Sequence, residues 1–571
     1  MLGGLGALSR TDAAGSFPLN GTDTKGEAIM NVRHFGAVLV VVLVVGGLLF
    51  SGVAAAWDID WVDQFGNSTY VDTTGGSATD ATGVYVAGSV FGALPGQGGG
   101  AGGFDAYLRK YDFAGNVLWT DHVGTPATEI GLGIATEPSG VYITGATDGT
   151  LPGQISAGGL DAFVRKYSAG GTVLWTRQFG TSVTDVPMIG GVATHQTGVY
   201  VVGETFGTFP GAADGNGRDI FLARLNAQDG QLLWVRQFGI RGGARLGIGG
   251  VSADDTGVYA AGIHYLGQDA DALLRKYDFD GNLLWVRELA GTPSCGATFW
   301  GLATHDTNLY VVGQWTNAFF EDPTSCHGAA LGPVVGVVLK YDSSGNLLWR
   351  RRLKGVGEGS FTGAKNIYAS ETGVYVSANL TTTFPGHVAD VPRSDRSECR
   401  GLTPGNQFAD KLDAYVRRYD FDGNVIWTHQ FGSNVFDLVT GVSTDATGVY
   451  AAGDTSCQID DAAEDFSGGV RDGFLLRIAI EPTSLPGQVQ LIVGQLETLN
   501  DTGRFTPGEF GSLVQQLEAT LQALDRENLA AARQTLEVFV RRVSTFESRG
   551  TLTPTETDVL IAAANGVIAQ L

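Results

Sequence analysis

Most of the chain alternates between short hydrophobic runs and turns rich in glycine. Runs such as LLWVRQFG (232–239) alternate hydrophobic and polar residues, as half-buried strands do. Runs such as GVYVAG (83–88) are apolar on both sides, which is typical of buried strands. Polar turns such as TDATG (79–83) separate these runs. The pattern predicts many short antiparallel β-strands.

Three sequence elements recur seven times each, so an internal repeat is the main signal in the sequence. The first is a tryptophan in a run such as LLW or DW, at Trp61, Trp119, Trp175, Trp234, Trp285, Trp349 and Trp427. The second is close to GVYVAG and spans 83–88, 140–145, 198–203, 257–262, 308–313, 373–378 and 448–453. The third is close to DAYLRKY and begins at Asp105, Asp161, Asp219, Asp271, Gly336, Asp413 and Asp472. These elements supply strands B (GVYVAG), C (DAYLRKY) and D (LLWVRQFG) of each unit, and a strand A precedes the polar turn.

Four antiparallel strands repeated seven times predict a mainly β fold, a seven-bladed β-propeller. An extended β-solenoid is the alternative, but the ends of the array argue against it. Residues 58–66 form a lone strand D, whereas residues 436–478 supply strands A, B and C without a strand D. We therefore predict that 58–66 completes the last blade as its outer strand. This pairing closes the ring and removes an open sheet edge.

The turn between strands C and D can be interpreted as a metal site or as a hairpin. In YDFDGNVIW, Asp420, Asp422 and Asn424 alternate beside Gly423, as at the start of a calcium loop. Glycine is present in all six such turns, whereas the acids are not. A hairpin needs only a residue that tolerates positive φ. We predict a hairpin turn, with calcium as the alternative and no other cofactor.

The loops of the predicted propeller are unequal on its two faces. Because chain direction alternates from A to D, the B–C and D–A loops share one face, and the A–B and C–D turns share the other. The turns are uniformly tight, but the B–C loops range from the short 263–270 to the long 379–412. Insertions on one face of a repeat array often mark the binding side. We predict that a partner binds the B–C/D–A face, with neutral loop growth as the alternative.

Four cysteines fall in the loops of this face, in neighbouring blades. They are Cys295, Cys326, Cys399 and Cys457. For an exported protein we predict disulfides Cys295–Cys326 and Cys399–Cys457, each holding a long insertion. A zinc site is the alternative, although there is no CxxC pair and only His327 lies near a cysteine.

Several acids and histidines recur at fixed places in the repeat. Asp105, Asp161, Asp219, Asp271, Asp413 and Asp472 open strand C. We predict that each accepts backbone N–H groups of the turn before its strand, whereas a ring of carboxylates holding a cation near the channel is the alternative. His195 and His305 fall where other units carry Asp80, Asp254 or Asp445. This interchange indicates a polar turn position, not a ligand or a general base.

No catalytic motif is recognisable in the sequence. GxSxG, HExxH and a phosphate-binding glycine loop with lysine are all absent. Sugar-active propellers need two acids at a defined separation, and sequence alone does not pair any two acids. We therefore predict no catalytic, cofactor-binding or metal-binding residue. The alternative is an extracellular glycan-active enzyme with carboxylates in the central channel.

The N-terminal segment predicts export. Arg33, the apolar run 35–50 and the small residues 54–56 have the layout of a signal peptide, with an uncleaved membrane anchor as the alternative. Residues 1–29 look unlike a signal, so Met30 is a candidate for the true start. The formal net charge of −23 disfavours nucleic acid and anionic lipid as partners. We expect an extracellular or cell-surface protein, in contact with a membrane only through this segment.

The C-terminal part of the chain changes from a strand pattern to a helix pattern. A linker with two prolines (481–488) precedes four sets of apolar residues at helical spacing within 489–571. TPGE (506–509) and TPTE (553–556) are helix starts with a threonine cap and a glutamate three residues later. The sequence predicts a small four-helix bundle after a propeller that spans 57–480.

The GVYVAG, FPG, DAYLRKYDxxGNxLW and QFG elements together resemble the SBBP repeats of bacterial extracellular proteins. The resemblance covers about residues 58–478 and implies a secreted seven-bladed propeller scaffold, with structural rather than catalytic shared positions. Blade five departs most, because Gly336 stands where the other units carry aspartate.

The C-terminal tail resembles the FIMAH domain, a helical module of bacterial extracellular proteins, in its FTPGEF and LTPTE helix starts. Its role is either attachment to a surface or partner, or passive capping of the fold. We expect a secreted or cell-surface, non-catalytic propeller that binds an extracellular protein or polysaccharide through its B–C/D–A face.

Overall fold

The structure is a computed structural model of the whole chain. It describes residues 59–66, 72–94, 97, 102–212, 218–239, 249–266, 269–289, 297–316, 334–353, 362–380, 413–432, 437–456, 471–480 and 484–571. The predicted leader (1–56) and all four cysteines, Cys295, Cys326, Cys399 and Cys457, lie outside these ranges. In the part of the chain so described, no helix has the length and apolar character needed to cross a bilayer.

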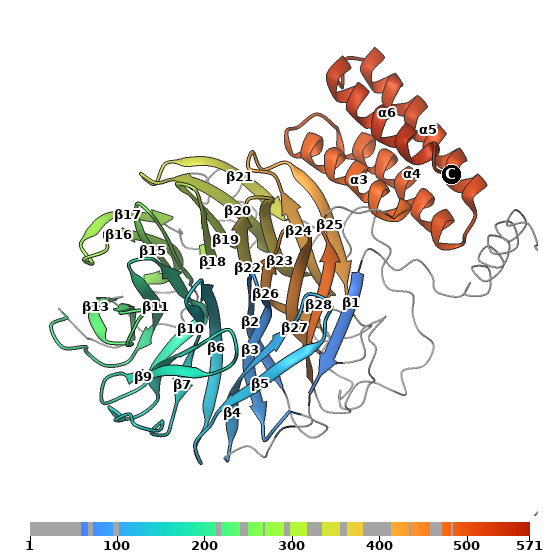
Figure 1. The fold of residues 1–571 in the computed structure, drawn as a ribbon. Coiled ribbons are helices and arrows are strands. Elements are labelled where there is room, and N and C mark those ends of the chain that lie inside the picture. The colour runs from blue at the N-terminus through green and yellow to red at the C-terminus, as the bar shows by residue number, and fades with distance from the viewer. Residues whose placement is uncertain are drawn as a thin grey trace, which may run out of the picture. The chain divides into compact units, whose positions relative to one another are not determined.

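The described strands form seven four-stranded antiparallel sheets (Figure 1). Blade one comprises β2 (Thr73–Asp80), β3 (Gly83–Phe91), β4 (Phe104–Tyr111) and β5 (Val117–Val123). Blade two comprises β6 (Glu129–Glu137), β7 (Gly140–Thr147), β8 (Asp161–Tyr167) and β9 (Val173–Phe179). Blade three comprises β10 (Asp185–His195), β11 (Gly198–Thr205), β12 (Asp219–Leu225) and β13 (Leu232–Gly239).

The remaining blades follow the same order of strands A, B, C and D. Blade four comprises β14 (Val251–Asp254), β15 (Gly257–Leu266), β16 (Asp269–Tyr277) and β17 (Leu283–Leu289). Blade five comprises β18 (Ala297–His305), β19 (Asn308–Thr316), β20 (Val334–Asp342) and β21 (Leu347–Leu353). Blade six comprises β22 (Thr362–Ser370), β23 (Gly373–Leu380), β24 (Asp413–Tyr419) and β25 (Val425–Phe431). Blade seven comprises β26 (Asp437–Thr444), β27 (Gly448–Thr455), β28 (Asp472–Ala479) and β1 (Ile59–Phe65).

The seven sheets form a closed ring. Each strand A contacts the strand A of the next blade, and the last of these contacts, between β26 and β2, joins blade seven to blade one. The outer strand of blade seven is β1, which pairs antiparallel with β28, so that Val62 lies opposite Leu476. The predicted propeller of seven blades, closed by an N-terminal outer strand, is therefore confirmed.

The hydrophobic core lies between neighbouring blades. The tyrosine of every strand B is fully buried: Tyr85, Tyr142, Tyr200, Tyr259, Tyr310, Tyr375 and Tyr450 all have 0% exposure. One cluster joins Val84 and Val86 of blade one to Tyr450 and Leu475 of blade seven. Strand B is apolar on both sides because a neighbouring blade covers each of its faces.

Four helices follow the propeller, as predicted. They are α3 (Leu485–Asp501), α4 (Pro507–Asp525), α5 (Leu529–Ser548) and α6 (Pro554–Ile568). They share one core that includes Leu496, Leu517, Phe539 and Leu560. The two predicted helix starts are capping boxes, in which Thr506 pairs with Glu509 and Thr553 pairs with Glu556.

Helix α3 begins inside the segment 481–488 that the sequence predicts as a linker. Ser484 caps the helix by accepting the N–H of Gly487, and Pro486 lies in the first turn. A proline there breaks no helical hydrogen bond, because the first N–H groups of a helix have no intrahelical partner. Pro486 therefore marks the start of α3, so the helix begins four residues earlier than predicted.

Candidate functional site

The seven repeated tryptophans of strand D join neighbouring blades. Each indole Nε1–H donates to a backbone carbonyl at the C–D turn of the next blade. The pairs are Trp61 with Phe113, Trp119 with Ala169, Trp175 with Ala227, Trp234 with Phe279, Trp285 with Ser343, Trp349 with Phe421 and Trp427 with Ile480, at 2.9–3.2 Å. The Trp61 bond joins blade seven to blade one, so these bonds run round the whole ring.

The basic residues of strand C share the same acceptors. Lys110 Nζ donates to Ala169 O at 2.9 Å, and Arg224 Nη1 donates to Phe279 O at 2.6 Å. Lys166, Lys276, Lys340 and Arg418 make the equivalent bonds in blades two, four, five and six. Burial lowers the pKa of Lys110 and of Lys276. These cations are held within the fold and are not presented to a ligand.

The C–D turns are hairpins in which acidic side chains accept hydrogen bonds from the same turn. In blade six, Asp420 Oδ1 accepts the N–H groups of Asp422 and Asn424, and Asp420 Oδ2 accepts the Asn424 side chain. Gly423 has φ +81°, which favours glycine. In blade four, the side-chain hydrogen bond from Asn282 lowers the pKa of Asp278. The geometry is the predicted hairpin, and the aspartate that would begin a calcium loop makes hydrogen bonds within the turn.

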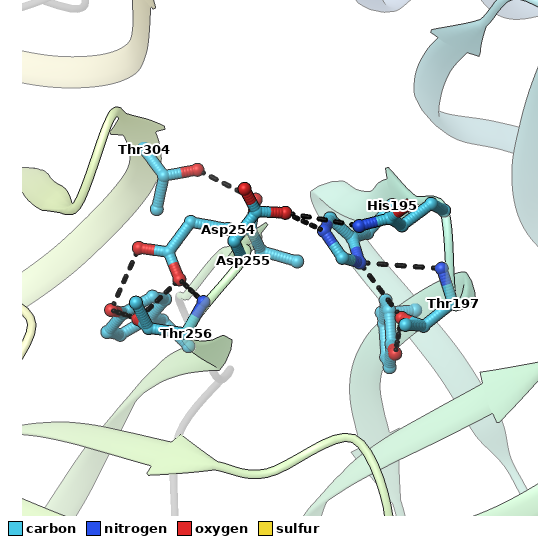
Figure 2. Close-up of polar contacts among 10 residues, drawn as sticks. His195, Thr197, Asp254, Asp255, Thr256 and Thr304 are labelled. Carbon is cyan, nitrogen blue, oxygen red and sulfur yellow. Dashed lines mark hydrogen bonds and ion pairs between the residues drawn. The ribbon is translucent and has the colours of Figure 1, made fainter.

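The A–B turn of blade three brings a hydroxyl, an imidazole and a carboxylate together (Figure 2). His195 Nδ1 lies 3.0 Å from Thr197 Oγ1, and His195 Nε2 lies 3.1 Å from Asp255 Oδ1. This order of groups is that of a hydrolase triad. Thr197 Oγ1, however, also lies 2.6 Å from the buried Tyr200 hydroxyl. The carboxylate of Asp255 is 84% exposed, so water solvates it.

The equivalent turn of blade four shows the role of the cluster around His195. In blade four, Asp254 takes the place of His195 and accepts the N–H and hydroxyl of Thr256 at 2.7 and 2.6 Å. Asp254 also accepts the Tyr259 hydroxyl at 3.0 Å. The His195 ring stacks on Phe279 of the next blade, with centroids 4.9 Å apart. We assign the cluster to the bonding between blades and not to catalysis.

His305 occupies the same place in blade five. Its ring stacks on Phe421 of blade six, with centroids 4.8 Å apart and an interplanar angle of 2°. The structure therefore places both predicted turn histidines against the C–D turn of the following blade. The sequence signal for this contact is the phenylalanine in the DFDG turns, which the sequence analysis did not connect to the histidines.

The aspartates that open strand C are buried in their own blades. Asp105, Asp161, Asp219 and Asp472 are each less than 5% exposed. Asp161 accepts the N–H of Ala157 at 2.8 Å and the side-chain amide of Gln178 at 2.7 Å. Gln237 donates to Asp219 in the same way at 2.6 Å. Asp271 and Asp413 lie in β16 and β24, but their side chains are outside the described residues.

Strand C is the third strand from the axis, so these aspartates do not line the central channel. They lie against the glycine of the QFG element instead. A methyl group at Gly180 would lie 2.5 Å from Asp161 Oδ1 and 2.8 Å from Asp185 Oδ2. This contact explains why a glycine ends strand D. Among the described residues, no three His, Cys, Asp or Glu side chains are grouped so as to hold a metal ion.

The pairing register corrects the sequence alignment of blade five. Val90 pairs with Asp105 in blade one, and the equivalent Trp315 of blade five pairs with Val335. Val335, and not Gly336, therefore occupies the aspartate position. Gly336 takes the place of Ala106, one residue further along strand C. The sequence also contains this register, because counting back from the shared Lys-Tyr that ends strand C (Lys340 and Tyr341 in blade five) leads to Val335. The pairing shows the same register directly.

The first strands carry two polar networks that the sequence analysis missed. The Thr79 hydroxyl donates to Thr444 O, and the Thr136 hydroxyl donates to Thr79 O, both at 2.7 Å. Glu129 accepts the N–H of Thr125 at 2.6 Å, and Asp185 accepts the N–H of Thr181. Burial raises the pKa of Asp185. The signals are the threonine that precedes five of the seven A–B turns, absent only where Ala253 and Ala369 stand, and an acid four residues after a threonine.

On the B–C/D–A face, three large apolar side chains are exposed in blades two and three. Ile155 is 86% exposed, Phe206 50% and Val183 40%. Phe206 N–H donates to Thr184 O at 2.9 Å, which places Phe206 next to Val183. The Arg218 guanidinium lies 5.2 Å from the centre of the Phe206 ring and pairs with Glu204. We call Ile155, Val183 and Phe206 the loop patch.

Comparisons with known proteins find only distant similarity. No protein-family model matches the chain. It is 22% identical over 440 residues to an uncharacterised WD repeat-containing protein of Acanthamoeba polyphaga mimivirus. That match covers 60% of this chain and 30% of the viral protein, so the chain spans under a third of that relative's length.

Solved structures with a similar arrangement include BamB from Moraxella catarrhalis, at 14% identity and a TM-score of 0.33, covering 70% of this chain and 95% of BamB. The Trypanosoma rangeli sialidase has 11% identity and a TM-score of 0.33, covering 68% of this chain and 59% of the sialidase. At these TM-scores we base no functional conclusion on them. The chain is a seven-bladed β-propeller scaffold with four C-terminal helices.

Proposed function

We propose that the protein is a non-catalytic scaffold that binds a protein partner through the loop patch. The observation that carries this proposal is the exposure of Ile155, Val183 and Phe206 on adjoining loops. Val183 and Phe206 lie side by side, and Ile155 is on the neighbouring loop. Groups of exposed apolar side chains often mark interaction sites. The ion-paired Arg218 beside Phe206 adds a polar rim of the kind that surrounds protein interfaces.

The described polar clusters favour binding over catalysis. The carboxylates of Glu129 and Asp185, in the first strands, already accept backbone N–H groups. His195 is stacked on Phe279 in the only hydroxyl–imidazole–carboxylate cluster that we find among the described residues. A glycosidase needs two acids that face one another across a substrate. Because these polar groups are already engaged within the fold, the loop patch is a better candidate for a binding site than they are for a catalytic site.

We also propose that the chain is exported, as the resemblance to SBBP-repeat and FIMAH-containing bacterial proteins implies. The supporting feature is the signal-like segment 30–56. Export would in turn permit the predicted disulfides Cys295–Cys326 and Cys399–Cys457. In this proposal the helical tail is an attachment module. An open groove of about 660 Å³ between α4 and α5, lined by Arg541, Arg542 and Arg549, offers it a basic surface.

The test is a binding screen with matched variants. The chain from residue 57 onward is applied to extracellular protein arrays and glycan arrays, with a glycoside hydrolase panel in parallel. We expect a protein ligand whose binding is lost in the double variant I155D/F206D. Binding should be kept in V173D, which changes an exposed valine (42%) outside the loop patch. Turnover of a polysaccharide, or ligand binding unaffected by I155D/F206D, would overturn the proposal.

A further inference from the structure

Helix α3 is bound to the outer edge of blade six through three contacts. Thr498 Oγ1 accepts the N–H of Val425, the first residue of β25, at 2.9 Å. Gly494 lets the helix approach closely, since a methyl group there would lie 2.9 Å from Ile426 O. Glu497 pairs with Arg417 of β24 at 2.8 Å. Val425 is only 3% exposed as a result.

The charges of this interface are complementary. Arg417 is 3% exposed at its side chain and Glu497 is 11% exposed. Asp501, one turn after Glu497, interacts electrostatically with Arg417, Arg351 and Arg352. The acidic end of α3 thus faces the arginines of strands C and D in blades six and five. A buried arginine needs such a partner, because an uncompensated buried charge is costly.

In blades one and two, the arginine equivalent to Arg417 already has its partners inside the propeller. Arg109 lies 3.8 Å from Asp63 of the preceding blade, and its Nε donates to Thr120 at 3.1 Å. Arg165 of blade two makes the same two contacts, with Asp121 and Thr176. In blade six, Arg351 of the preceding blade stands where those aspartates stand, and α3 supplies the missing carboxylate.

Blade four has the features of blade six but no helix. Its equivalent arginine, Arg275, pairs in register with Val286, where blades one, two and six have threonine. Arg236 of the preceding blade stands at the aspartate position. The Nε of Arg275 is buried without a hydrogen-bond partner. The guanidinium rests over the Phe238 ring, 4.4 Å from its centre.

The apolar pair at the start of strand D is exposed in blade four. Leu283 is 48% exposed and Leu284 is 51% exposed. In blade six the same positions are Val425 and Ile426, which α3 covers. Blades one and two also expose this pair, but their arginines are neutralised internally. Blades three and five carry Ala223 and Leu339 at the arginine position. Blade seven carries Leu476 there. Among the described residues, blade four alone therefore combines the exposed pair with an arginine for which no carboxylate partner is found.

We propose that the outer edge of blade four binds an acidic amphipathic helix of a partner protein. The helix would present a small residue, a carboxylate three residues later and a hydroxyl beside it, as in Gly494, Glu497 and Thr498 of α3. The carboxylate pairs with Arg275, the hydroxyl accepts the Leu283 N–H, and the apolar face covers Leu284. This site is separate from the loop patch, and the proposal does not depend on the proposed function.

The test uses α3 itself as the probe, as a labelled synthetic peptide of residues 484–502 added to the full chain. Blade six is occupied by the chain's own α3, so one peptide is expected to bind per chain, at blade four. L284D and R275L should each weaken binding at least tenfold in fluorescence anisotropy. R275L places in blade four the residue that blade five carries naturally at Leu339, so it is expected to fold.

Two controls give the experiment its specificity. L118D makes the same change at the exposed pair of blade one, where Asp63 neutralises Arg109, and should leave binding unchanged. A peptide with Glu497→Lys should bind at least tenfold more weakly than the native peptide. Hydrogen exchange should slow at residues 283–289 when the native peptide binds. No binding at millimolar peptide, or equal binding to L284D and to the unaltered chain, would refute the proposal.

Discussion

At the residue scale, the glycine of each C–D turn serves two purposes. Gly230 has φ +71°, a conformation that favours glycine. A methyl group there would also lie 2.6 Å from the Trp175 ring of the preceding blade. Position 230 must therefore lack a side chain for two reasons. The backbone has a positive φ there, and the Trp175 ring needs the space to reach its carbonyl acceptor. At Gly281 and Gly345 the side chain that an added methyl would meet is Arg236 or Arg287 of the preceding blade. Positive φ and a close side chain therefore explain why glycine is present in every C–D turn while the acids vary.

Replacing Gly230 by alanine should separate these two requirements. Gly153 has nearly the same φ, +75°, but no atom within 4 Å of an added methyl group. We expect G153A to cost about 1 kcal/mol, from backbone strain alone. G230A should cost about 1–2 kcal/mol more, because the Trp175 ring must move. Chemical denaturation of both variants measures the difference, and equal losses would show that the Trp175 contact is unimportant.

The repeated positions could be found in the sequence, but their partners could not. The period shows that Trp175 is a repeat position, yet its acceptor, Ala227 O, is a backbone atom in the next unit, which no side-chain pattern marks. The His195 group was correctly expected at a turn, but its stack on Phe279 depends on how neighbouring blades are rotated. A sequence period shows which positions are equivalent from one repeat to the next. It does not show which residues of neighbouring repeats touch, because packing decides that.

At the element scale, α3 is the helix of the tail that touches the propeller. Strand β25 resembles the other D strands in sequence, so the pattern gave no reason to single it out. Arg351 at the preceding blade's aspartate position does not distinguish blade six either, because Arg236 and Arg287 occupy that position before blades four and five. The difference is the partner on α3, Glu497, which lies 80 residues after Arg417. The propeller blades and the helix boundaries could be predicted from periodicity and capping residues. The docking of α3 could not, because its contacts with β24 and β25, among them the Arg417–Glu497 ion pair and the Thr498–Val425 hydrogen bond, join segments that are distant in the chain.

A glycine-to-alanine pair can test the docking of α3. Alanine favours a helix over glycine by about 1 kcal/mol. G511A in α4 places its methyl group in open space, so we expect it to stabilise the bundle by about 0.5–1 kcal/mol. G494A brings its methyl group to 2.9 Å from Ile426 O, so docking should weaken and cancel the gain. Thermal unfolding of both variants is the measurement, and equal stabilisation by the two would contradict the close contact.

At the scale of the whole molecule, closure of the ring also buries a carboxylate. Asp454 of β27 accepts the N–H of Thr74 in β2 at 2.6 Å, across the joint between blades seven and one. Asp454 is 2% exposed, and burial raises its pKa to about 7. Arg471 lies 3.9 Å away and offsets only part of this effect. The joint that closes the propeller therefore contains an acid that ionises near neutral pH.

This acid should make stability depend on pH. Between its ordinary pKa of 3.8 and about 7, Asp454 binds more protons in the folded state than in the unfolded state. The free energy of unfolding therefore falls as pH rises through this window. The contribution of Asp454 to this fall is at most about 4 kcal/mol. D454N keeps an acceptor for Thr74 and should lose less stability between pH 5 and pH 8. D255N, which alters an 84% exposed carboxylate, should follow the parent protein. The melting temperature is measured at pH 5 and pH 8. An equal fall in melting temperature for D454N and the parent protein would contradict the expectation.

The pairing of β1 with β28 has a consequence for biosynthesis. The side chains of Gln64 and Asp472, which meet across this pair, are 408 residues apart in the chain. The ribosome makes β1 as the first strand and β28 as the last, so the final blade stays incomplete until residue 479 has been added. Contacts between such distant segments form slowly. A nascent chain released before β28 would therefore be an open arc of blades with an unpaired β1, a substrate for chaperones and proteases and not a smaller ring.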